Sequence, residues 1–199
     1  MPYFFNNFPD VKYDVNKNDK FQTVKNILLR YQFRDFPLYK NKTSVFYQHT
    51  VEEGQRPDII AERYYKDASL HWIVLITNNI IDPYYDWPLD YTEFQNYVRE
   101  KYRYQGSLVN QGGIEWAQSN IHHYEWEYQQ QSVQFDGTII PKKFYIVDES
   151  TYNSKLPDER RAVSYYVNEQ EINDNKRTIN ILKDSYVPQF LREAESIFE

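Results

Sequence analysis

The sequence predicts an α+β protein, because segments with helical spacing and segments with strand alternation both occur in it. Apolar residues recur at helical spacing within residues 57–102, aromatic and charged residues alternate within residues 121–148, and residues 1–20 show neither period. We therefore expect an N-terminal arm and helix (1–45), a central β-α-α module (46–105), and a C-terminal antiparallel β-hairpin and helical region (106–199).

Residues 1–20 mix aromatic residues with Asn, Asp and Pro, and this composition predicts an extended arm. From Thr23, the run TVKNILLRYQFRDF has apolar residues at helical spacing, which predicts a helix. Extended chain before Pro37 fits the same residues, because the residue before a proline disfavours helical geometry.

The run SVFYQHTVEEG alternates and predicts a short strand, which Gly54 closes. Pro57 suits the first turn of a helix, and Asp58 adds the acidic residue that the helix dipole favours there. A second helix, SLHWIVLITNN, follows with Ser69 as its N-cap. The first helix has one apolar side, formed by Ile59, Ile60, Ala61 and Tyr64.

The second helix is expected to end at Asn78 and Asn79, because Asn tolerates the left-handed backbone that ends helices. Asp82-Pro83 cannot continue it. The next run, DYTEFQNYVREKY, predicts an amphipathic helix whose apolar face consists of Tyr91, Phe94, Tyr97 and Val98.

Gly106 and the pair Gly112-Gly113 predict a flexible boundary before the C-terminal region. Residues 121–148 are predicted to form antiparallel sheet, since HYEWEYQ alternates, Asp136-Gly137 is a hairpin turn signal, and KFYIVDES follows. The run AVSYYVNEQEIN predicts another strand and NDNKRTINILKDSYV a helix. A last helix around Pro188 has one apolar stripe, formed by Phe190, Leu191, Ala194, Ile197 and Phe198.

The amino-acid composition and the net charge limit the kinds of partner and site that this chain can have. Aromatic residues make up 18% of the chain, with 20 Tyr, and amphipathic aromatics are what protein interfaces favour. The net charge of −6 and the absence of a basic stripe argue against nucleic acid as a partner. Cysteine is absent, which excludes disulfide scaffolds and thiolate metal sites. We expect no export signal and no membrane span, because the longest apolar run, residues 72–76, is short.

One segment carries the motifs of a known module. It opens with Thr50, Val51 and Gly54, continues with Ile60, Ala61, Tyr64 and Tyr65, and closes with Asn78, Asn79, Ile81, Asp82 and Pro83. This pattern resembles a LysM module, whose β-α-α-β unit implies a LysM-like fold. The chain departs from that module after Pro83, where YYDWPLDYTEF replaces the return strand and enters a helix. The departure argues against a free-standing glycan binder.

A longer set of motifs resembles the phage T4-type baseplate wedge protein family, the gene 53 product of contractile-tailed phages. The motifs are R-P-x-x-I-A-x-x-x-Y, L-x-W-x-x-L-x-x-N-N, D-P-Y-Y-x-W and N-x-x-K-R-x-I-x-I-L. They fall on Arg56, Pro57, Ile60, Ala61 and Tyr65; on Leu70, Trp72, Leu75, Asn78 and Asn79; on Asp82, Pro83, Tyr84, Tyr85 and Trp87; and on Asn173, Lys176, Arg177, Ile179, Ile181 and Leu182.

This resemblance implies a structural, non-enzymatic protein of the virion tail, assembled in the host cytoplasm. Such proteins join the wedges of the baseplate around the tail hub and help to hold the ring that nucleates the sheath. The partners it implies are other wedge proteins and neighbouring wedges within a large hetero-oligomeric assembly. It implies no cofactor, no nucleic acid and no membrane.

Two sets of apolar residues are the candidate partner-binding residues. Tyr84, Tyr85 and Trp87 lie in a Pro-bounded loop and exceed what the core of a small module can absorb, so they predict interface anchors. The alternative is that they pack on the chain's own following helix. The second set belongs to the last helix and consists of Phe190, Leu191 and Phe198. Trp72 and Leu75 are expected to fill the core of the module.

Catalytic and metal chemistry find little support in the sequence. His122 and His123 are adjacent, which predicts side chains on opposite faces of a strand rather than a metal site. Glu125 and Glu127 share a strand face, but acids on one strand do not flank a sugar from two sides. Two rival functions stay open, a LysM-type peptidoglycan or chitin binder and a tail-associated muramidase.

Overall fold

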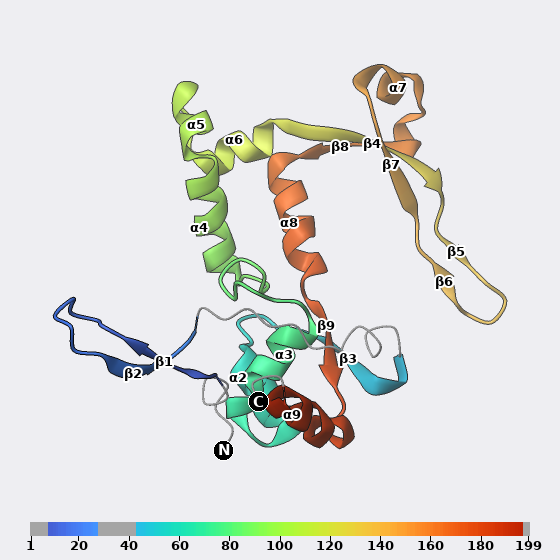
Figure 1. The fold of residues 1–199 in the computed structure, drawn as a ribbon. Helices are drawn as coiled ribbons and strands as arrows, with labels where there is room; N and C mark the ends of the chain where they lie inside the picture. Colours follow the sequence, from blue (N-terminus) through green and yellow to red (C-terminus); the bar gives the residue numbers. More distant parts are fainter. Residues whose placement is uncertain (1–7, 28–42, 197–199) are drawn as a thin grey trace. The chain divides into compact units, whose positions relative to one another are not determined.

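The computed structural model describes residues 8–27 and 43–196 and divides the chain into two compact units (Figure 1). Unit 1 comprises residues 1–88 and 176–199, and unit 2 comprises residues 89–175. Each unit has a buried hydrophobic core of its own. The C-terminal segment therefore belongs with the N-terminal half, whereas the sequence suggested boundaries at residues 45 and 105.

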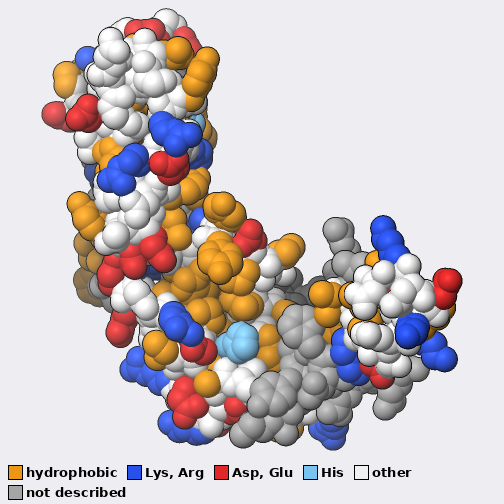
Figure 2. Space-filling model, turned by 90° about the vertical axis from the view of Figure 1, so that its left-hand side faces the viewer, with side chains coloured by type: hydrophobic (Ala, Val, Ile, Leu, Met, Phe, Trp, Pro, Cys, Tyr) orange, Lys and Arg blue, Asp and Glu red, His pale blue; other side chains and the backbone are white. Residues whose placement is uncertain are grey.

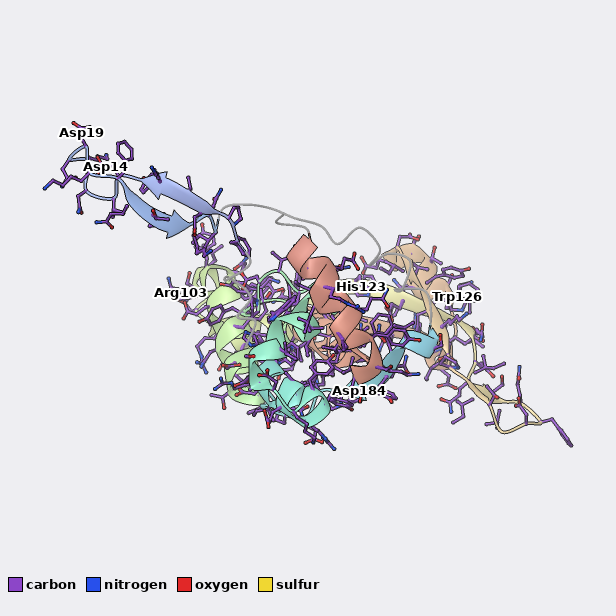
Figure 3. The ribbon with its side chains drawn as sticks, turned by 60° about the horizontal axis from the view of Figure 1, so that its bottom comes forward. Asp14, Asp19, Arg103, His123, Trp126 and Asp184 are labelled. Carbon is purple, nitrogen blue, oxygen red and sulfur yellow. The ribbon has the colours of Figure 1, made fainter. Side chains whose placement is uncertain are left out.

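Unit 1 begins with an antiparallel hairpin of β1 (Asp10–Tyr13) and β2 (Gln22–Lys25). Asp14 and Asp19 lie at its far end (Figure 3), where the Asp19 N–H donates to the Asp14 carboxylate over 2.7 Å. The predicted arm is therefore wrong for residues 10–20, and the helix predicted from Thr23 is wrong where β2 lies. Lys17 and Asp19 adopt the positive φ that a glycine usually supplies in such a turn, so this hairpin carried no turn signal. The rest of that predicted helix, residues 28–36, lies outside the described residues.

The main body of unit 1 is a β-α-α-β unit. It consists of β3 (Phe46–Thr50), α2 (Pro57–Tyr65), α3 (His71–Thr77) and β9 (Thr178–Leu182), with short 3₁₀ turns at Thr43–Val45 and Ala68–Leu70. β9 runs antiparallel to β3, with Gln48 opposite Asn180 (Figure 1). As predicted, α2 starts at Pro57. The strand predicted to close at Gly54 ends earlier, at Thr50, and Gly54 takes a positive φ of 68° in the turn that follows. Ser69 is not the N-cap of α3 as predicted, because Ser69 lies inside the 3₁₀ turn and the N-cap position of α3 is Leu70. The turn itself is capped by Asp67, whose carboxylate accepts the Ser69 N–H over 2.9 Å.

β9 corrects the sequence prediction of a helix over residues 173–187. Ile179 and Ile181 are buried in the core, while Asn180 between them bonds to Asn78. A 3₁₀ turn (Asp184–Tyr186) then leads to α9 (Val187–Ser196), which confirms the last predicted helix.

Two clusters of buried side chains hold unit 1 together. One joins α3 to α9 and the end of β9; it consists of Val45, Leu70, Trp72, Ile73, Leu182, Val187, Phe190 and Ala194. The other joins α2, α3 and β9; it consists of Val51, Ile60, Ala61, Val74, Trp87, Ile179 and Ile181. Trp72 is a core residue as expected and Leu75 packs partly buried, whereas Ile59 remains 52% exposed.

The helical part of unit 2 contains α4 (Tyr91–Lys101), α5 (Arg103–Leu108), α6 (Gly113–Ser119) and α8 (Tyr165–Asn175). Its core is formed by Phe94, Val98, Tyr102 and Ala117. Tyr91, predicted on the apolar face of α4, is 71% exposed. The strand predicted from Ala162 ends at Ser164, and α8 follows it.

Gly106 and Gly113 permit close packing within unit 2, and the division between the units does not fall at these glycines as predicted. A Cβ on Gly113 would lie 2.3 Å from the backbone oxygen of Arg99, so α6 can approach α4 only without a side chain there. Gly106 lies in α5 and is buried against the backbone of residues 111 and 112.

The sheet of unit 2 has the order β7 (Lys143–Val147), β4 (Ile121–Gln129), β8 (Arg160–Ser164), and both pairings are antiparallel. β5 (Ser132–Val133) and β6 (Ile139–Ile140) form a hairpin between β4 and β7, with Gly137 at a φ of 84° in its turn. Helix α7 (Glu149–Ser154) and a 3₁₀ turn (Pro157–Glu159) connect β7 to β8. This region confirms the predicted antiparallel sheet.

The two ends of unit 2 meet. Asn173 accepts the backbone N–H of Leu89 over 2.8 Å, and its amide donates to the Leu89 carbonyl over 3.1 Å. The chain therefore leaves unit 2 close to the residue at which it enters that unit. This is why α3 and β9 can belong to one β-α-α-β unit although residues 89–175 lie between them in the sequence. No helix within the described ranges combines the length and apolar character needed to cross a bilayer.

Candidate protein-protein interface

The loop that follows α3 is held in one shape by two aspartates. The Asp86 carboxylate accepts the backbone N–H groups of Ile81 and Asp82, both over 3.1 Å, and the Asp82 carboxylate accepts that of Tyr84 over 2.9 Å. The Asp86 N–H returns to the Asp82 carbonyl over 2.8 Å. Residues 81–86 are therefore held mainly by hydrogen bonds within the loop.

The electrostatics of this loop favour the ionised carboxylate. The backbone N–H groups of Asp82 and Ile81 lower the pKa of Asp86, and the nearby positive charge of Lys176 acts in the same direction. The ammonium group of Lys176 also donates to the Tyr85 carbonyl. Asp86 therefore remains charged at neutral pH, with both backbone bonds intact.

This ordered loop presents apolar side chains to solvent. Ile81, Tyr84 and Tyr85 are 91%, 84% and 63% exposed. Trp87 is different, because it is only 8% exposed and its indole N–H donates to the Gln55 carbonyl over 2.9 Å. Of the three predicted anchors, Tyr84 and Tyr85 face solvent and Trp87 fills the core of unit 1. The sequence analysis did not include Ile81 among the anchors.

The candidates in α9 lie mainly in the core. Phe190 is 5% exposed and its ring lies 5.8 Å from that of Trp72, and Leu191 is partly buried against the same cluster. Phe198 lies outside the described residues. Phe190 therefore stabilises unit 1 and is not exposed for a partner.

The residues of the LysM-like motif have structural positions. Ile60, Ala61 and Trp72 are buried, Tyr65 is partly buried against both clusters, and Asn79 takes a positive φ of 55°. Asn78 bonds to the backbone of β9. Pro83 lies in the exposed loop.

A second exposed aromatic surface lies on unit 2, and sequence analysis missed it. Alternate residues of a strand share a face, so Tyr124, Trp126 and Tyr128 of β4 lie together with Tyr145 of β7, which is opposite Trp126. The rings of Tyr128 and Tyr145 stack with centroids 4.0 Å apart, and these side chains are 40% and 55% exposed. We call these four residues the aromatic face.

The opposite face of the same sheet carries a polar network around Glu125. Glu125 is buried and accepts hydrogen bonds from Arg161 and from His123, the latter over 3.1 Å. Burial alone would raise the pKa of Glu125, but hydrogen bonds from Arg161 and His123 outweigh it and lower the pKa. His123 and Trp126 both lie on β4 (Figure 3), on its two different faces.

The prediction that His122 and His123 point to opposite faces is wrong. A β-bulge between Ile121 and His123 changes the alternation, and the two Nδ1 atoms lie 2.7 Å apart. Among the described residues, no group of three or more His, Cys, Asp or Glu side chains is arranged to hold a metal ion.

A third polar cluster joins two helices of unit 2. Lys101 and Tyr102 donate to the buried carboxylate of Glu169 in α8, each over 2.7 Å. Burial would raise the pKa of Glu169, yet these bonds outweigh it and lower the pKa. The cluster is a satisfied structural network.

On the face that Figure 2 shows, acidic and basic side chains are interspersed, with hydrophobic ones between them.

The chain was compared with protein families and with curated proteins. The family model described as Base plate wedge protein 53 matches residues 3–194. The comparison with curated proteins found no match.

Proposed function

The chain belongs to the base plate wedge protein 53 family and has a structural role in a phage tail base plate, and from this premise we propose that it joins wedge proteins around the hub of a contractile tail. The proposed partners are other wedge proteins and neighbouring wedges, and assembly would take place in the host cytoplasm. The protein would act through buried contact area rather than catalysis.

The observation that carries this proposal is the ordered aromatic loop after α3. Backbone N–H bonds to the carboxylates of Asp82 and Asp86 fix the backbone that holds Tyr84 and Tyr85 in solvent, so little backbone conformational entropy remains to be lost on docking. Preorganised, exposed tyrosines are typical of interface anchors. Exposed apolar side chains of this kind have no evident purpose within unit 1.

The test is co-expression with the other base plate proteins encoded by the same phage genome, followed by size exclusion with light scattering. Wild-type chain should elute in a stable hetero-complex. Replacing both tyrosines (Tyr84→Ala, Tyr85→Ala) should weaken that complex about 30-fold, equivalent to roughly 2 kcal/mol. The matched control is Tyr91→Ala with Tyr104→Ala, since these tyrosines are 71% and 72% exposed elsewhere on the chain.

A wild-type chain that stays monomeric with every partner would contradict the joining role. An unchanged complex in the double variant of the loop would contradict only the role of Tyr84 and Tyr85.

A second candidate function gains support from one structural observation. The return strand, whose absence argued against peptidoglycan binding, is supplied by β9, so the β-α-α-β unit is complete. A pelleting assay with purified cell walls tests this candidate, and retention of the chain in the pellet would favour it.

A further inference from the structure

Three basic side chains lie on or beside the aromatic face of unit 2. Lys143 follows the same alternation as Tyr145, and Arg160 lies opposite Trp126 on β8. The ammonium group of Lys155 lies 3.8 Å from the centre of the Trp126 ring. Within the described part of the chain, no carboxylate forms an ion pair with Lys143, Lys155 or Arg160.

The opposite face of the sheet provides an internal comparison. There Lys142 pairs with Glu127 at 3.4 Å, and Arg161 pairs with both Glu125 and Glu171. Lys142 and Arg161 thus form ion pairs on the opposite face, whereas their sequence neighbours Lys143 and Arg160 on the aromatic face form none within the described part of the chain. The Glu159 carboxylate reaches the aromatic face, where it accepts the Trp126 indole N–H over 3.4 Å, but it forms no ion pair with the three cations there. Cations without a carboxylate partner beside exposed aromatic rings suit an acidic partner.

The geometry of the rings limits what that partner can be. Bases and sugars bind by stacking on open ring faces. Here Tyr128 and Tyr145 stack on each other, Lys155 covers Trp126, and Arg160 lies 4.6 Å from the centre of the Tyr152 ring beside Tyr124. The remaining exposed parts of the rings suit apolar contact with side chains of a protein.

We infer that the aromatic face binds an acidic segment of another base plate subunit, with carboxylates meeting Lys143, Lys155 and Arg160. This inference rests on the proposed assembly role and names the chemistry of one partner. Because β7 is an edge strand of the sheet, an extended segment can also lie alongside it and share backbone hydrogen bonds.

Zero-length cross-linking with a carbodiimide tests this directly, because it joins a lysine only to a carboxylate in contact with it. In the co-expressed complex, Lys143 and Lys155 should cross-link to Asp or Glu of another subunit, identified by mass spectrometry. In the isolated chain they should give no such product. Two pairs within the chain serve as positive controls, Lys25 with Asp10 at 3.0 Å and Lys142 with Glu127 at 3.4 Å.

A matched pair of variants measures the contribution of the charge. Lys143→Gln, Lys155→Gln and Arg160→Gln together should weaken the complex at least about tenfold, with steep salt dependence. The control changes Lys12, Lys17 and Lys20 to Gln, which alters net charge equally on the exposed hairpin of unit 1. The variant Lys143→Gln with Lys155→Gln keeps the Arg160 bond to Tyr152, and should retain wild-type thermal unfolding while still weakening the complex.

The outcomes separate the two proposals. An intact complex with both control cross-links present but Lys143 and Lys155 unlinked would overturn this inference and leave the assembly role standing. Failure to form any complex would overturn the assembly role. If a labelled oligothymidylate or a peptidoglycan fragment binds more tightly to wild type than to the glutamine variant, the inference of an acidic protein segment is overturned and that ligand is the occupant of the aromatic face.

Discussion

The side chain of Asn78 forms hydrogen bonds with the backbone of β9 of the kind that a neighbouring strand would form. Its amide donates to the Asn180 carbonyl over 2.9 Å and to the Val74 carbonyl over 2.8 Å, and its oxygen accepts the Asn180 N–H over 2.8 Å. A single residue thus ends α3 and fastens β9, although the two are far apart in the sequence. Buried backbone groups are costly when unpaired, which gives this amide its importance.

The change Asn78→Asp should lower the free energy of unfolding of unit 1 by about 2 kcal/mol, because a carboxylate cannot donate to the two carbonyls. Asn79→Asp is the matched control: Asn79 is exposed at a φ of 55°, which Asp also tolerates. Urea denaturation, with hydrogen exchange of the β9 amides, provides the measurement. Equal losses in the two variants would show that the bonds to Asn180 contribute nothing.

At the scale of elements, the contact of α6 with α4 depends on a missing side chain. Gly113→Ala should lower the free energy of unfolding of unit 2 by about 3 kcal/mol, because the new Cβ would meet the Arg99 backbone at 2.3 Å. Gly112→Ala should cost less than about 1 kcal/mol, since its Cβ would meet only the Glu115 side chain at 3.8 Å. Thermal unfolding of both variants checks this difference, and similar midpoints would refute it.

Sequence reasoning identified the elements whose signals are local. Helix α2 has Pro57 at its start, and Asn79 follows the end of α3, so both were predicted. β9 was not predicted, because its partner β3 is distant in the sequence and because charged residues typical of helices surround β9. Helix α8 was taken for a strand, since its buried positions Glu169 and Asn173 are polar and hide the helical period.

The candidate interface residues were likewise predictable from the sequence only where local contacts decide their exposure. Exposure of Tyr84 and Tyr85 follows from the loop itself, whereas burial of Trp87 depends on the Gln55 carbonyl in another loop. The cations of the aromatic face became visible only when register placed Lys143 and Arg160 on one face. Pairing between distant segments is what the sequence alone did not show.

At the scale of the whole molecule, the two units differ in how much of the chain each requires. Unit 2 is continuous, from Leu89 to Asn175, whereas unit 1 needs both ends of the chain. A chain of residues 1–175 loses β9 and α9, and with them six buried positions: Ile179, Ile181, Leu182, Val187, Phe190 and Ala194.

We expect residues 89–175 alone to unfold cooperatively and the chain of residues 1–175 to contain a folded unit 2 beside an unprotected unit 1. Hydrogen exchange read by mass spectrometry distinguishes the two units in each chain. Strong protection of α2 and α3 in the shortened chain would show that β9 and α9 are dispensable.

The bond between Leu89 and Asn173 has a consequence for the order in which the protein forms on the ribosome. Unit 2 is complete once Asn175 has emerged, before β9 and α9 follow it. β3, α2 and α3 were made earlier, but they must wait for β9, and at 5–20 residues per second that delay is on the order of ten seconds. The part of the chain that is synthesised first is thus among the last to reach its final structure, and during that interval the apolar sides of α2 and α3 need protection from other nascent tail proteins.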